Sequence, residues 1–442
     1  MTPPGMTLPV LALGAWLKNT ACLARWGAQP SVTWSDAHGD LSDPDACRAL
    51  EASAQALLAQ AGPGGVAAIA HDLHPDFFST QLAVRLAQQL GVPAVGVQHH
   101  HAHVAAVAAE WDFKDPADTA HPQTWLGLAL DGVGLGTDGT AWGGELLAVH
   151  SAATGAPAGT PPGWQRLGHL QTLALPGGDK AAREPWRMLA ASLHISEHPA
   201  LLEQALEAKF PSKLSHTQVA TVAQMLARGL NCPPTTSAGR WFDAAAAALG
   251  LCGWQHDEAE AAQALERAAS AALADEALPT EQATPPDRPA LPPLPTLPAA
   301  RWTDSAAPPA ADADTEAPPR VLELAPLVQA LCAVDATDTA AVRRAAAAFH
   351  RALADALVAG VLHAREHWRG PGPAPRRVAL SGGCFFNRLL RERVQHGLHT
   401  AGLVTALPTH RGCGDAGLAL GQAWVAWQHC VNSPHQELLS CV

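Results

Sequence analysis

Residues 92–110 read VPAVGVQHHHAHVAAVAAE, an apolar run followed at once by a histidine-rich and then an alanine-rich run. Residues 92–98 are short and mostly apolar, which is typical of a buried strand. The composition of His99–Glu110 favours a helix. A strand that leads directly into a helix is the repeating unit of α/β proteins.

The same alternation continues on both sides of this stretch. Toward the N-terminus, the pattern predicts two short strands around a glycine turn in 8–25, a helix over 45–62, a strand within 64–75 and a helix over 79–91. Toward the C-terminus, it predicts strand–turn–strand in 124–150, helices over 180–275 and 339–367, strand–turn–helix in 376–395 and turn–helix in 412–428. The whole chain is therefore expected to form an α/β fold.

The length and composition indicate a globular protein of two lobes or domains. The chain has 442 residues, which is too many for one compact core, and 48% of them are apolar. No stretch reaches the roughly 18–20 uninterrupted apolar residues of a membrane span. The N-terminal residues MTPPGMTLPVLALG lack a basic segment before a long apolar run. We therefore expect no secretory signal, no membrane partner and a cytoplasmic protein.

Charge and cysteine content argue against several classes of function. The formal charge is −12 and no basic stripe is present, which argues against nucleic-acid binding. The nine cysteines are scattered and form no C-x-x-C pair, which argues against a disulfide framework and a zinc ribbon. Residues 278–320 are rich in proline and small polar residues, so we expect a flexible insertion, linker or surface loop there.

His99 and His103 are candidate metal ligands within the histidine run. Residues four apart on a helix lie on the same face, one turn from each other. Two neutral imidazoles at that spacing can share one metal ion, whereas His100 and His101 would point elsewhere. Spacing alone leaves two interpretations open, a ligand pair and a helix that is His-rich in a chain with 22 histidines.

Asp131 stands at the end of an apolar strand, before the glycine-rich turn Gly132-Val133-Gly134-Leu135-Gly136-Thr137-Asp138-Gly139. Glycines let backbone N–H groups approach phosphate oxygens, and an aspartate at a strand end can ligate a metal or meet a phosphate through one. A tight β-hairpin explains Thr137-Asp138-Gly139 equally well.

Three further glycine junctions follow, and they are Pro176-Gly177-Gly178-Asp179-Lys180, Ser381-Gly382-Gly383 and Gly412-Cys413-Gly414-Asp415-Ala416-Gly417. The second opens a helix that bears Asn387, and a helix N-terminus reached through Gly-Gly is a natural anion site. The Lys-Ser/Thr ending of a P-loop is missing. Asp415 either caps the next helix or faces a ligand. Four such junctions together indicate a nucleotide held between two lobes.

Longer strings make the interpretation specific. They are Leu17-Lys18-Asn19-Thr20; His71-Asp72-Leu73-His74-Pro75 with Ser79-Thr80; Val97-Gln98-His99-His100-His101-Ala102-His103; Leu130-Asp131-Gly132 through Trp142-Gly143-Gly144-Glu145; Leu175 through Asp179 and Arg183 through Arg187; Ser237 through Asp243; Phe349-His350; and Ser381 through Arg388. With these strings the chain resembles the C-terminal part of the HypF family, the carbamoyltransferases of NiFe-hydrogenase maturation. That part is similar to the TsaD-type threonylcarbamoyl transferases.

The resemblance implies an actin-like ATPase (ASKHA) fold, in which duplicated ribonuclease-H-like units form two lobes around a nucleotide cleft. The expected lobes are residues 1–170, with the histidine helix and the Asp131 hairpin, and residues 171–442, with the flexible insertion at about 278–320. A bound iron or zinc ion is implied as well. Matching the motifs residue by residue assigns its ligands, His99, His103, Asp131 and Asp415.

The resemblance also implies further site residues. The nucleotide would be held by Gly132, Gly134, Gly136, Asp138, Gly139, Gly177, Gly178, Asp179, Gly382, Gly383 and Asn387. The expected catalytic residues are His99, His103, Asp131, Lys18 and Arg183. Lys18 and Arg183 would neutralise phosphate or carbamate charge, although ordinary surface pairing accounts for them equally well.

The implied reaction moves a carbamoyl group from carbamoyl-adenylate to the C-terminal cysteine of a HypE-type partner, for cyanide ligand synthesis. The adenylate derives from carbamoyl phosphate and ATP, with Mg²⁺ allowed beside the nucleotide, and the donor is also open to hydrolysis. Since no acylphosphatase, zinc-finger or YrdC-like module fits into this chain, a separate YrdC-like protein is an expected partner. Cys384 and Cys413 lie in glycine loops but are expected to be small buried side chains rather than catalytic groups.

Several positions depart from the family pattern. Asp415-Ala416-Gly417 stands for Asp-Gly-Gly, Phe386 stands for glutamine, and Glu258-Ala259-Glu260 stands for Glu-Gly-Gln. The metal ligands survive these changes, whereas the residues that contact substrate need not. Two alternatives therefore stay open, an O-carbamoyltransferase that acts on a small-molecule hydroxyl and a non-catalytic scaffold that holds metal and nucleotide.

Overall fold

The computed structural model describes residues 9–27, 29–114, 123–151, 163–196, 199–277, 295–304, 318–370 and 372–432. Its contacts divide the chain into two compact units. The first contains Met1–Leu167, Val361–Phe386 and His399–Val442, and the second contains Gly168–Gly360 and Asn387–Leu398. The chain passes from the first unit to the second after Leu167, and it returns to the first unit at Val361 and again at His399.

The predicted alternation of strands and helices is confirmed along the chain. The strands are β1 (Val10–Ala12), β2 (Cys22–Arg25), β3 (Ser31–Trp34), β4 (Ala68–Asp72), β5 (Ala94–Val97), β6 (Thr124–Leu135), β7 (Ala141–His150), β8 (Trp164–Leu170), β9 (Leu173–Ala174), β10 (Pro234–Thr235), β11 (Arg301–Thr303), β12 (Arg320–Glu323), β13 (Arg377–Ser381) and β14 (Val404–Ala406). The helices are α1 (Pro44–Gln60), α2 (Phe78–Leu90), α3 (His99–Lys114), α4 (Asp179–Arg183), α5 (Pro185–Ile195), α6 (Pro199–Lys209), α7 (His216–Arg228), α8 (Ala238–Ala248), α9 (Glu260–Ala277), α10 (Ala325–Cys332), α11 (Thr339–Glu366), α12 (Arg388–Thr400) and α13 (Leu418–Asn432). Short 3-10 turns, η2 (Gly383–Phe386) and η3 (Asp415–Gly417), precede α12 and α13.

The first unit contains two sheets of the same topology. The first sheet has the order β3-β2-β1-β4-β5, in which β1, β2 and β3 pair antiparallel and β4 and β5 join parallel to β1. The second is part of a larger sheet, whose path in the first unit is β8-β7-β6-β13-β14, with β6 antiparallel to β7 and with β13 and β14 added in parallel. From Gly168 onward, β8 also pairs in parallel with β12. In the first unit, three strands consecutive in the chain are thus extended by two parallel strands in each sheet, which is the expected duplicated arrangement.

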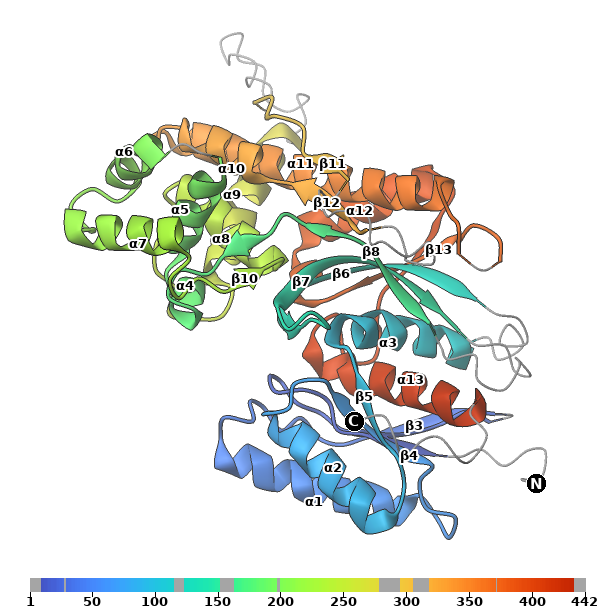
Figure 1. Cartoon of the computed structure of the whole chain (residues 1–442). Helices are drawn as coiled ribbons and strands as arrows, with labels where there is room; N and C mark the ends of the chain where they lie inside the picture. Colours follow the sequence, from blue (N-terminus) through green and yellow to red (C-terminus); the bar gives the residue numbers. More distant parts are fainter. Residues whose placement is uncertain are drawn as a thin grey trace, which may run out of the picture. The chain divides into compact units, whose positions relative to one another are not determined.

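Period-two alternation in the short strands fills the space on both faces of the first sheet. Leu11 and Ile69 belong to a core cluster with leucines of α1 and α2, whereas Val10 and Ala68 belong to a cluster with α3 and α13. Successive side chains of a strand point to opposite faces, so both faces are covered by helices. In Figure 1, α3 and α13 lie side by side between the two sheets of this unit, and their contacts agree with that view.

Gly421 sets how closely α13 approaches α3. A Cβ atom at this position would lie 1.9 Å from the carbonyl oxygen of Ala102 and 2.7 Å from the amide nitrogen of Ala106. These atoms belong to the backbone of a buried helix, so they cannot move aside as a flexible side chain would. The glycine is therefore required by the close packing of the two helices.

We expect Gly421→Ala to lower the free energy of unfolding by about 2 kcal/mol or more, because overpacking a filled core outweighs the usual gain from alanine in a helix. Urea denaturation followed by circular dichroism measures the change. The control is Gly64→Ala, since a Cβ at Gly64 meets no atom within 4 Å. Equal stability of Gly421→Ala and the unaltered protein would contradict this packing.

The second unit is mainly helical, and its sheet elements include a strand that the sequence did not predict. Residues 278–320 were expected to be a loop, yet β11 pairs antiparallel with β12. The indole of Trp302 accounts for this, because its Nε1 donates to the carbonyl oxygen of Ala356 at 2.8 Å and its ring fills the space beside Gly360. Residues 278–294 and 305–317 of the expected insertion lie outside the described residues.

Helix α11 is long and apolar enough to pass a length and composition test for a membrane span. Of its most apolar 18-residue window, 67% is buried inside the protein. A core helix of a globular protein meets the same test, because its apolar faces pack against other elements rather than lipid. The burial of α11 is that of a core helix.

His350 on α11 is a buried imidazole that makes two hydrogen bonds. Its Nδ1 donates to the carbonyl oxygen of Ala346 at 2.8 Å, and its Nε2 accepts from the Nδ2 of Asn387 at 2.9 Å. The Oδ1 of Asn387 accepts from the amide of Leu390 at 3.0 Å, which orients the amide group. Burial lowers the pKa of His350 to about 4, although its backbone hydrogen bond opposes this shift.

Because the pKa of His350 is lower in the folded than in the unfolded chain, stability is lost as pH falls from about 6.5 toward 4. Between pH 7.5 and 5, we expect the free energy of unfolding to fall by about 2 kcal/mol more for the unaltered protein than for His350→Gln. Urea denaturation of both proteins at the two pH values measures this difference. Parallel pH dependence would contradict the buried neutral imidazole, and titration of the His350 ring by NMR is the direct check.

Candidate metal centre

Helix α3 starts directly after β5 and carries four histidines in its first five positions. The side chain of Gln98 starts the helix, because its Oε1 accepts from the amide of His101 at 2.8 Å. His99, His100, His101 and His103 are each at most 3% exposed. The helix is buried on every side over His99–Glu110, so each imidazole must find partners inside the protein.

His99 and His103 lie on one face of the helix and meet two carboxylates from distant segments. The Nε2 of His99 lies 3.4 Å from an oxygen of Asp131 and 3.8 Å from an oxygen of Asp415. The Nε2 of His103 lies 3.5 Å and 3.6 Å from the same two oxygens. One ligand atom from each of the four residues lies within 4.8 Å of all the others.

These separations fit a single ion. Metal–ligand bonds of about 2.1 Å in a tetrahedral site place the ligand atoms about 3.4 Å apart. The Nε2 of His103 is buried and makes no hydrogen bond among the described residues, although the two carboxylates face it. Two imidazoles and two carboxylates form a donor set that suits zinc or iron. The residues present therefore fit the metal ion that the sequence led us to expect.

Asp131 reaches the cluster because β6 is irregular at this point. The pairing of β6 with β7 shifts between Leu130 and Gly134, so the intervening residues leave the regular ladder. One oxygen of Asp131, Oδ1, accepts from the amide of Gly383 at 2.9 Å, which leaves Oδ2 facing both histidines. A bulge that redirects a side chain is a common feature beside functional sites.

Asp72 orients His99 from behind. Its Oδ2 accepts from the Nδ1 of His99 at 2.8 Å, and it is fully buried at the end of β4. A carboxylate on the second nitrogen of a ligating histidine fixes the tautomer and the ring orientation. From the sequence, Asp72 belongs to a family motif, but no role was predicted for it. Its position at a strand end, as for Asp131, was the available signal.

The hydroxyl of Ser381 supports the second histidine, because its Oγ lies 3.3 Å from the Nδ1 of His103. Burial lowers the pKa of both His99 and His103, but the carboxylates of the surrounding aspartates outweigh it and raise the pKa of each. Burial likewise raises the pKa of Asp131, but the two histidines outweigh it and bring that pKa well below its usual range. The cluster thus places two carboxylates opposite two basic nitrogens in a buried space.

His100 and His101 are outside this cluster. Burial holds the pKa of His100 well below its usual value, and burial lowers the pKa of His101 to about 3. The Nε2 of Gln98 donates to the Nδ1 of His100 at 3.1 Å, and the ring of His101 stacks against Trp164 at 5.6 Å. Both are neutral packing groups near neutral pH, which agrees with the expectation that they point elsewhere.

Asp415 lies in η3, one residue beyond Gly414, which occupies the cap position of that turn. Its carboxylate faces the two histidines. The neighbouring Phe386 is 57% exposed, and its ring lies against Gly412 and Gly414, where added Cβ atoms would come within 3.3 and 3.1 Å of it. This departure from the family pattern thus lies beside the segment that carries Asp415.

Several predicted nucleotide residues of the first unit have structural roles. Gly134 makes room for the rings of His99 and His100, and Gly136 makes room for the indole of Trp142. Asp138 accepts from the amide and the hydroxyl of Thr140 at 2.9 and 2.7 Å and so closes the hairpin. Gly132 and Gly139 meet no atom within 4 Å in the Cβ direction, and Gly382 and Gly383 lie directly after β13.

The remaining residues that were predicted to bind nucleotide or to act in catalysis are not part of the histidine–aspartate cluster. Lys18 is exposed, with its backbone in the left-handed region at φ 46° and its amide bound to Asp40 at 3.0 Å. Gly177, Gly178, Asp179, Arg183 and Asn387 belong to the second unit. Arg183 and Asp179 are exposed, whereas Asn387 is buried against His350.

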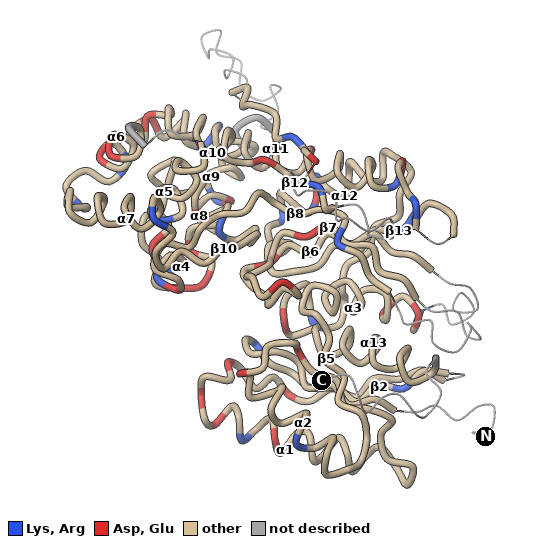
Figure 2. Tube along the Cα trace, in the orientation of Figure 1, with Lys and Arg blue, Asp and Glu red and all other residues tan. Residues whose placement is uncertain are grey.

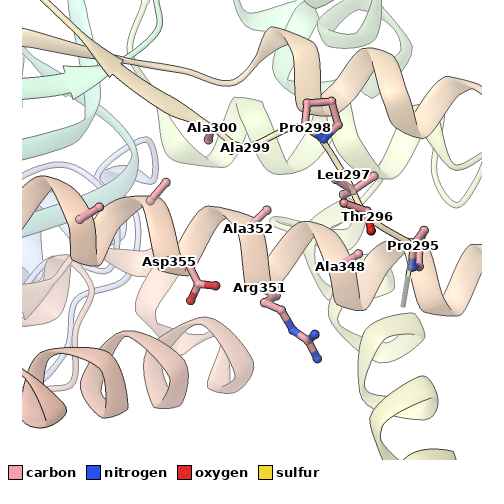
Figure 3. Close-up of a pocket in the computed structure, with 12 residues that line it drawn as sticks. Pro295, Thr296, Leu297, Pro298, Ala299, Ala300, Ala348, Arg351, Ala352 and Asp355 are labelled. Carbon is pink, nitrogen blue, oxygen red and sulfur yellow. The ribbon is translucent and has the colours of Figure 1, made fainter. Parts of the chain in front are cut away.

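Figure 2 shows that the charged residues of the described part of the chain are distributed over both units, with acidic and basic positions interspersed. A groove of about 460 Å³ in the second unit runs between residues 295–300 and α11 (Figure 3). Alanines of α11 form much of its lining, and Asp355 at its edge is paired with Arg393 at 2.7 Å. The groove thus lacks the converging polar groups that the histidine cluster has.

Comparison with known proteins gives the chain a family. Residues 127–422 match the family model described as the second subdomain of the carbamoyltransferase Kae1-like domain, and residues 6–110 match the HypF Kae1-like domain. A carbamoyltransferase HypF homolog of Cupriavidus necator is 49% identical over 419 residues, which cover 95% of this chain and 91% of that protein. The chain belongs to the HypF carbamoyltransferase family.

Other relatives are longer than this chain. The carbamoyltransferase HypF2 of Cupriavidus necator is 42% identical over 96% of this chain and 47% of that protein. The carbamoyltransferase HypF of Rhizobium leguminosarum bv. viciae is 35% identical over 96% of this chain and 46% of that protein. The chain thus spans about half the length of these relatives and nearly all of the HypF homolog.

Solved structures show the same fold. The crystal structure of T. kodakarensis HypF superposes with a TM-score of 0.70 at 28% identity, over 96% of this chain and 48% of that one. A full-length HypF in the phosphate- and nucleotide-bound form also gives 0.70, at 23% identity, over 96% of this chain and 56% of that one. The fold is therefore the expected actin-like ATPase type, and the family is one of carbamoyltransferase enzymes.

We expect His99→Ala and Asp415→Ala to lose bound metal, because each removes one of four ligands from a buried site. The measurement is the zinc and iron content per chain by mass spectrometry after loading and gel filtration. His101→Phe, which changes a buried ring of the same helix outside the cluster, should keep the metal. Equal metal content in the unaltered protein and all three variants would contradict the ligand assignment.

Proposed function

We propose that this protein transfers a carbamoyl group from carbamoyl-adenylate to the C-terminal cysteine thiol of a HypE-type partner, as a step toward cyanide ligands in NiFe-hydrogenase maturation. The adenylate derives from carbamoyl phosphate and ATP. The observation that carries the proposal is the buried cluster of His99, His103, Asp131 and Asp415 in a chain of the HypF carbamoyltransferase family.

His99, His103, Asp131 and Asp415 would hold an iron or zinc ion. When bound, such an ion supplies a Lewis acid and a template for an oxygen of the donor. The chain itself does the positioning. Asp72 holds the ring of His99 at 2.8 Å, and the amide of Gly383 holds Asp131 at 2.9 Å, so the ligand atoms are arranged before a substrate arrives.

The proposed transfer is a substitution at the carbamoyl carbon. The sulfur of the partner's thiol forms a bond to this carbon, the bond from the carbon to the phosphate oxygen of AMP breaks, and AMP leaves with the electron pair. The thiol proton passes to solvent, and the product is a thiocarbamate on the partner. Burial raises the pKa of Cys252, Cys332 and Cys430 to about 11, so these thiols stay protonated at neutral pH and are poor nucleophiles.

The nucleotide residues form a second part of the proposal. Gly132 and Gly139 have open space beside them, and Gly382 and Gly383 follow a parallel strand, as backbone groups that bind phosphate commonly do. Gly177, Gly178, Asp179 and Asn387 are proposed to contribute from the second unit. The exposed side chains of Lys18 and Arg183 are proposed to neutralise phosphate or carbamate charge.

The proposed setting is the cytoplasm, with a separate YrdC-like protein that makes or delivers the adenylate and Mg²⁺ beside ATP. The HypF homolog of Cupriavidus necator has nearly the same extent as this chain, so a chain of this length is shared by at least one relative. A small-molecule hydroxyl is the alternative acceptor. The exposed ring of Phe386 motivates this alternative, because it places an apolar group where the family pattern has glutamine, against Gly412 and Gly414 of the segment that carries Asp415.

The test supplies metal-loaded protein with carbamoyl phosphate, ATP, a YrdC-like enzyme and a peptide that ends in the HypE-type cysteine. We expect the peptide to gain one carbamoyl group by mass spectrometry. His99→Ala should lower this rate by at least about 100-fold, because removal of a Lewis acid costs several kcal/mol of transition-state stabilisation.

The matched control is His101→Phe, which should keep the activity within about twofold since the ring lies outside the cluster. Transfer to hydroxyl compounds but not to the thiol peptide would favour the alternative acceptor. Metal binding without turnover of any carbamoyl donor would contradict the enzymatic proposal and favour a scaffold that holds metal and nucleotide.

A further inference from the structure

Glu110 is a buried carboxylate that the reaction does not use. It lies on α3, three turns beyond His99, and is 4% exposed. Its Oε2 accepts from the amide and the hydroxyl of Thr409 at 2.8 and 2.6 Å. Its Oε1 accepts from the amide of His410 at 3.1 Å. All the groups that these three bonds join belong to the first unit.

Thr409 and His410 begin the segment that ends on Asp415. The two histidine ligands and Glu110 are on the same helix. Asp131 belongs to β6, and Asp415 follows His410, which lies 300 residues after Glu110 in the chain. An α-helix is rigid over this distance, so its two ends keep a fixed spacing. The helix therefore holds two metal ligands at one end and the start of the segment with a third ligand at the other.

The segment has other attachments, but they differ in kind. The amide of Gly382 donates to the carbonyl oxygen of Cys413 at 2.8 Å, and the hydroxyl of Thr20 donates to the carbonyl oxygen of Ala416 at 2.7 Å. Both satisfy carbonyl oxygens near Asp415. The guanidinium of Arg411 also donates to the carbonyl oxygen of Ser35 at 2.8 Å, which holds a side chain of the segment rather than its backbone. Glu110 instead satisfies two backbone amides where the segment begins, and these bonds attach the segment to the helix that carries the histidines.

A gain in stability does not explain why a carboxylate is buried at this position. Burying a charge costs several kcal/mol of solvation, and its hydrogen bonds do little more than offset that cost. What the three bonds do provide is direction, because two amides and one hydroxyl fix the path of the segment against α3. A fixed path is what a metal ligand five residues later requires.

We propose that Glu110 is a positioning residue for the metal centre, which places Asp415 opposite His99 and His103 by holding Thr409 and His410 against α3. This inference rests on the metal site of the proposed function and extends it to a residue that touches neither the ion nor the substrate.

The test is Glu110→Gln in the full chain, with Co²⁺ as the probe, since its absorbance reports the number and geometry of the ligands. The Nε2 of glutamine donates and faces donors, so at least one of the three bonds is lost. We expect the Kd for Co²⁺ to rise by about 10- to 100-fold, with a changed visible spectrum, as for other groups that orient metal ligands.

The matched control is Asp112→Asn on the same helix. Asp112 accepts from the Nε1 of Trp424 at 2.8 Å, so it also joins α3 to the C-terminal part of the chain, but through α13 rather than the Asp415 segment. It should bind Co²⁺ with unchanged Kd and spectrum. Equal weakening in both variants would overturn the proposal, because the effect would then be general loosening of α3.

Thr409→Val is the second variant and removes only the hydroxyl that donates to Glu110. It should raise the Kd by about 3- to 10-fold, which corresponds to the net contribution of one ordinary hydrogen bond, since the other two bonds to Glu110 remain. This measurement decides the matter if Glu110→Gln does not fold. Tight binding with an unchanged spectrum in the Glu110 and Thr409 variants would overturn the positioning role and leave the proposed function intact. Failure of the unaltered protein to bind Co²⁺ would overturn both.

Discussion

The burial of α3 between the two sheets of the first unit constrains the rest of the structure. Its residues from His99 to Glu110 have no solvent face, and these include several imidazoles and one carboxylate. Burying a polar group without a partner costs free energy, so partners from other segments matter most for the groups that carry charge. Asp72, Asp131 and Asp415 come to His99 and His103, and Thr409 and His410 come to Glu110. The contacts that these buried groups make therefore fix the positions of the segments around Asp131 and from Thr409 to Asp415.

The duplicated sheet topology explains why these partners are within reach. The parallel strands β4 and β13, one in each sheet, both end near the start of α3. The carboxylate of Asp72 at the end of β4 binds His99, and the amide of Gly383 after β13 binds Asp131. Small residues allow the close approach that the arrangement needs. Gly421 brings α13 onto α3, Gly134 gives room for the histidine rings, and alanines dominate the core between the helices. The metal centre is thus a product of close packing as much as of its ligands.

The same packing separates the chemical roles of neighbouring residues. Histidines adjacent in sequence divide into two that face carboxylates and two whose charge is suppressed by burial. Glycines of one hairpin also differ. An added Cβ at Gly134 or Gly136 would clash with an aromatic ring, whereas an added Cβ at Gly132 or Gly139 would meet no atom within 4 Å. Residue type alone does not make these distinctions, because they depend on which atoms of other segments occupy the space.

From the sequence we predicted most of the helices, the strands β1, β2, β4 to β7 and β13, the α/β class and the pair His99 and His103, because these depend on local periodicity and on spacing within one helix. The strands β3, β8 to β10, β12 and β14 were not predicted. The family motifs added Asp131 and Asp415. The strand at Arg301–Thr303 was wrongly expected to be a loop, since a contact of Trp302 with Ala356 determines it. Asp72 and Glu110 acquire their roles only through partners 27 and about 300 residues away. The chain encodes its local elements in nearest-neighbour patterns, whereas the tertiary fold decides which buried charges meet, because only packing brings distant groups within hydrogen-bond distance.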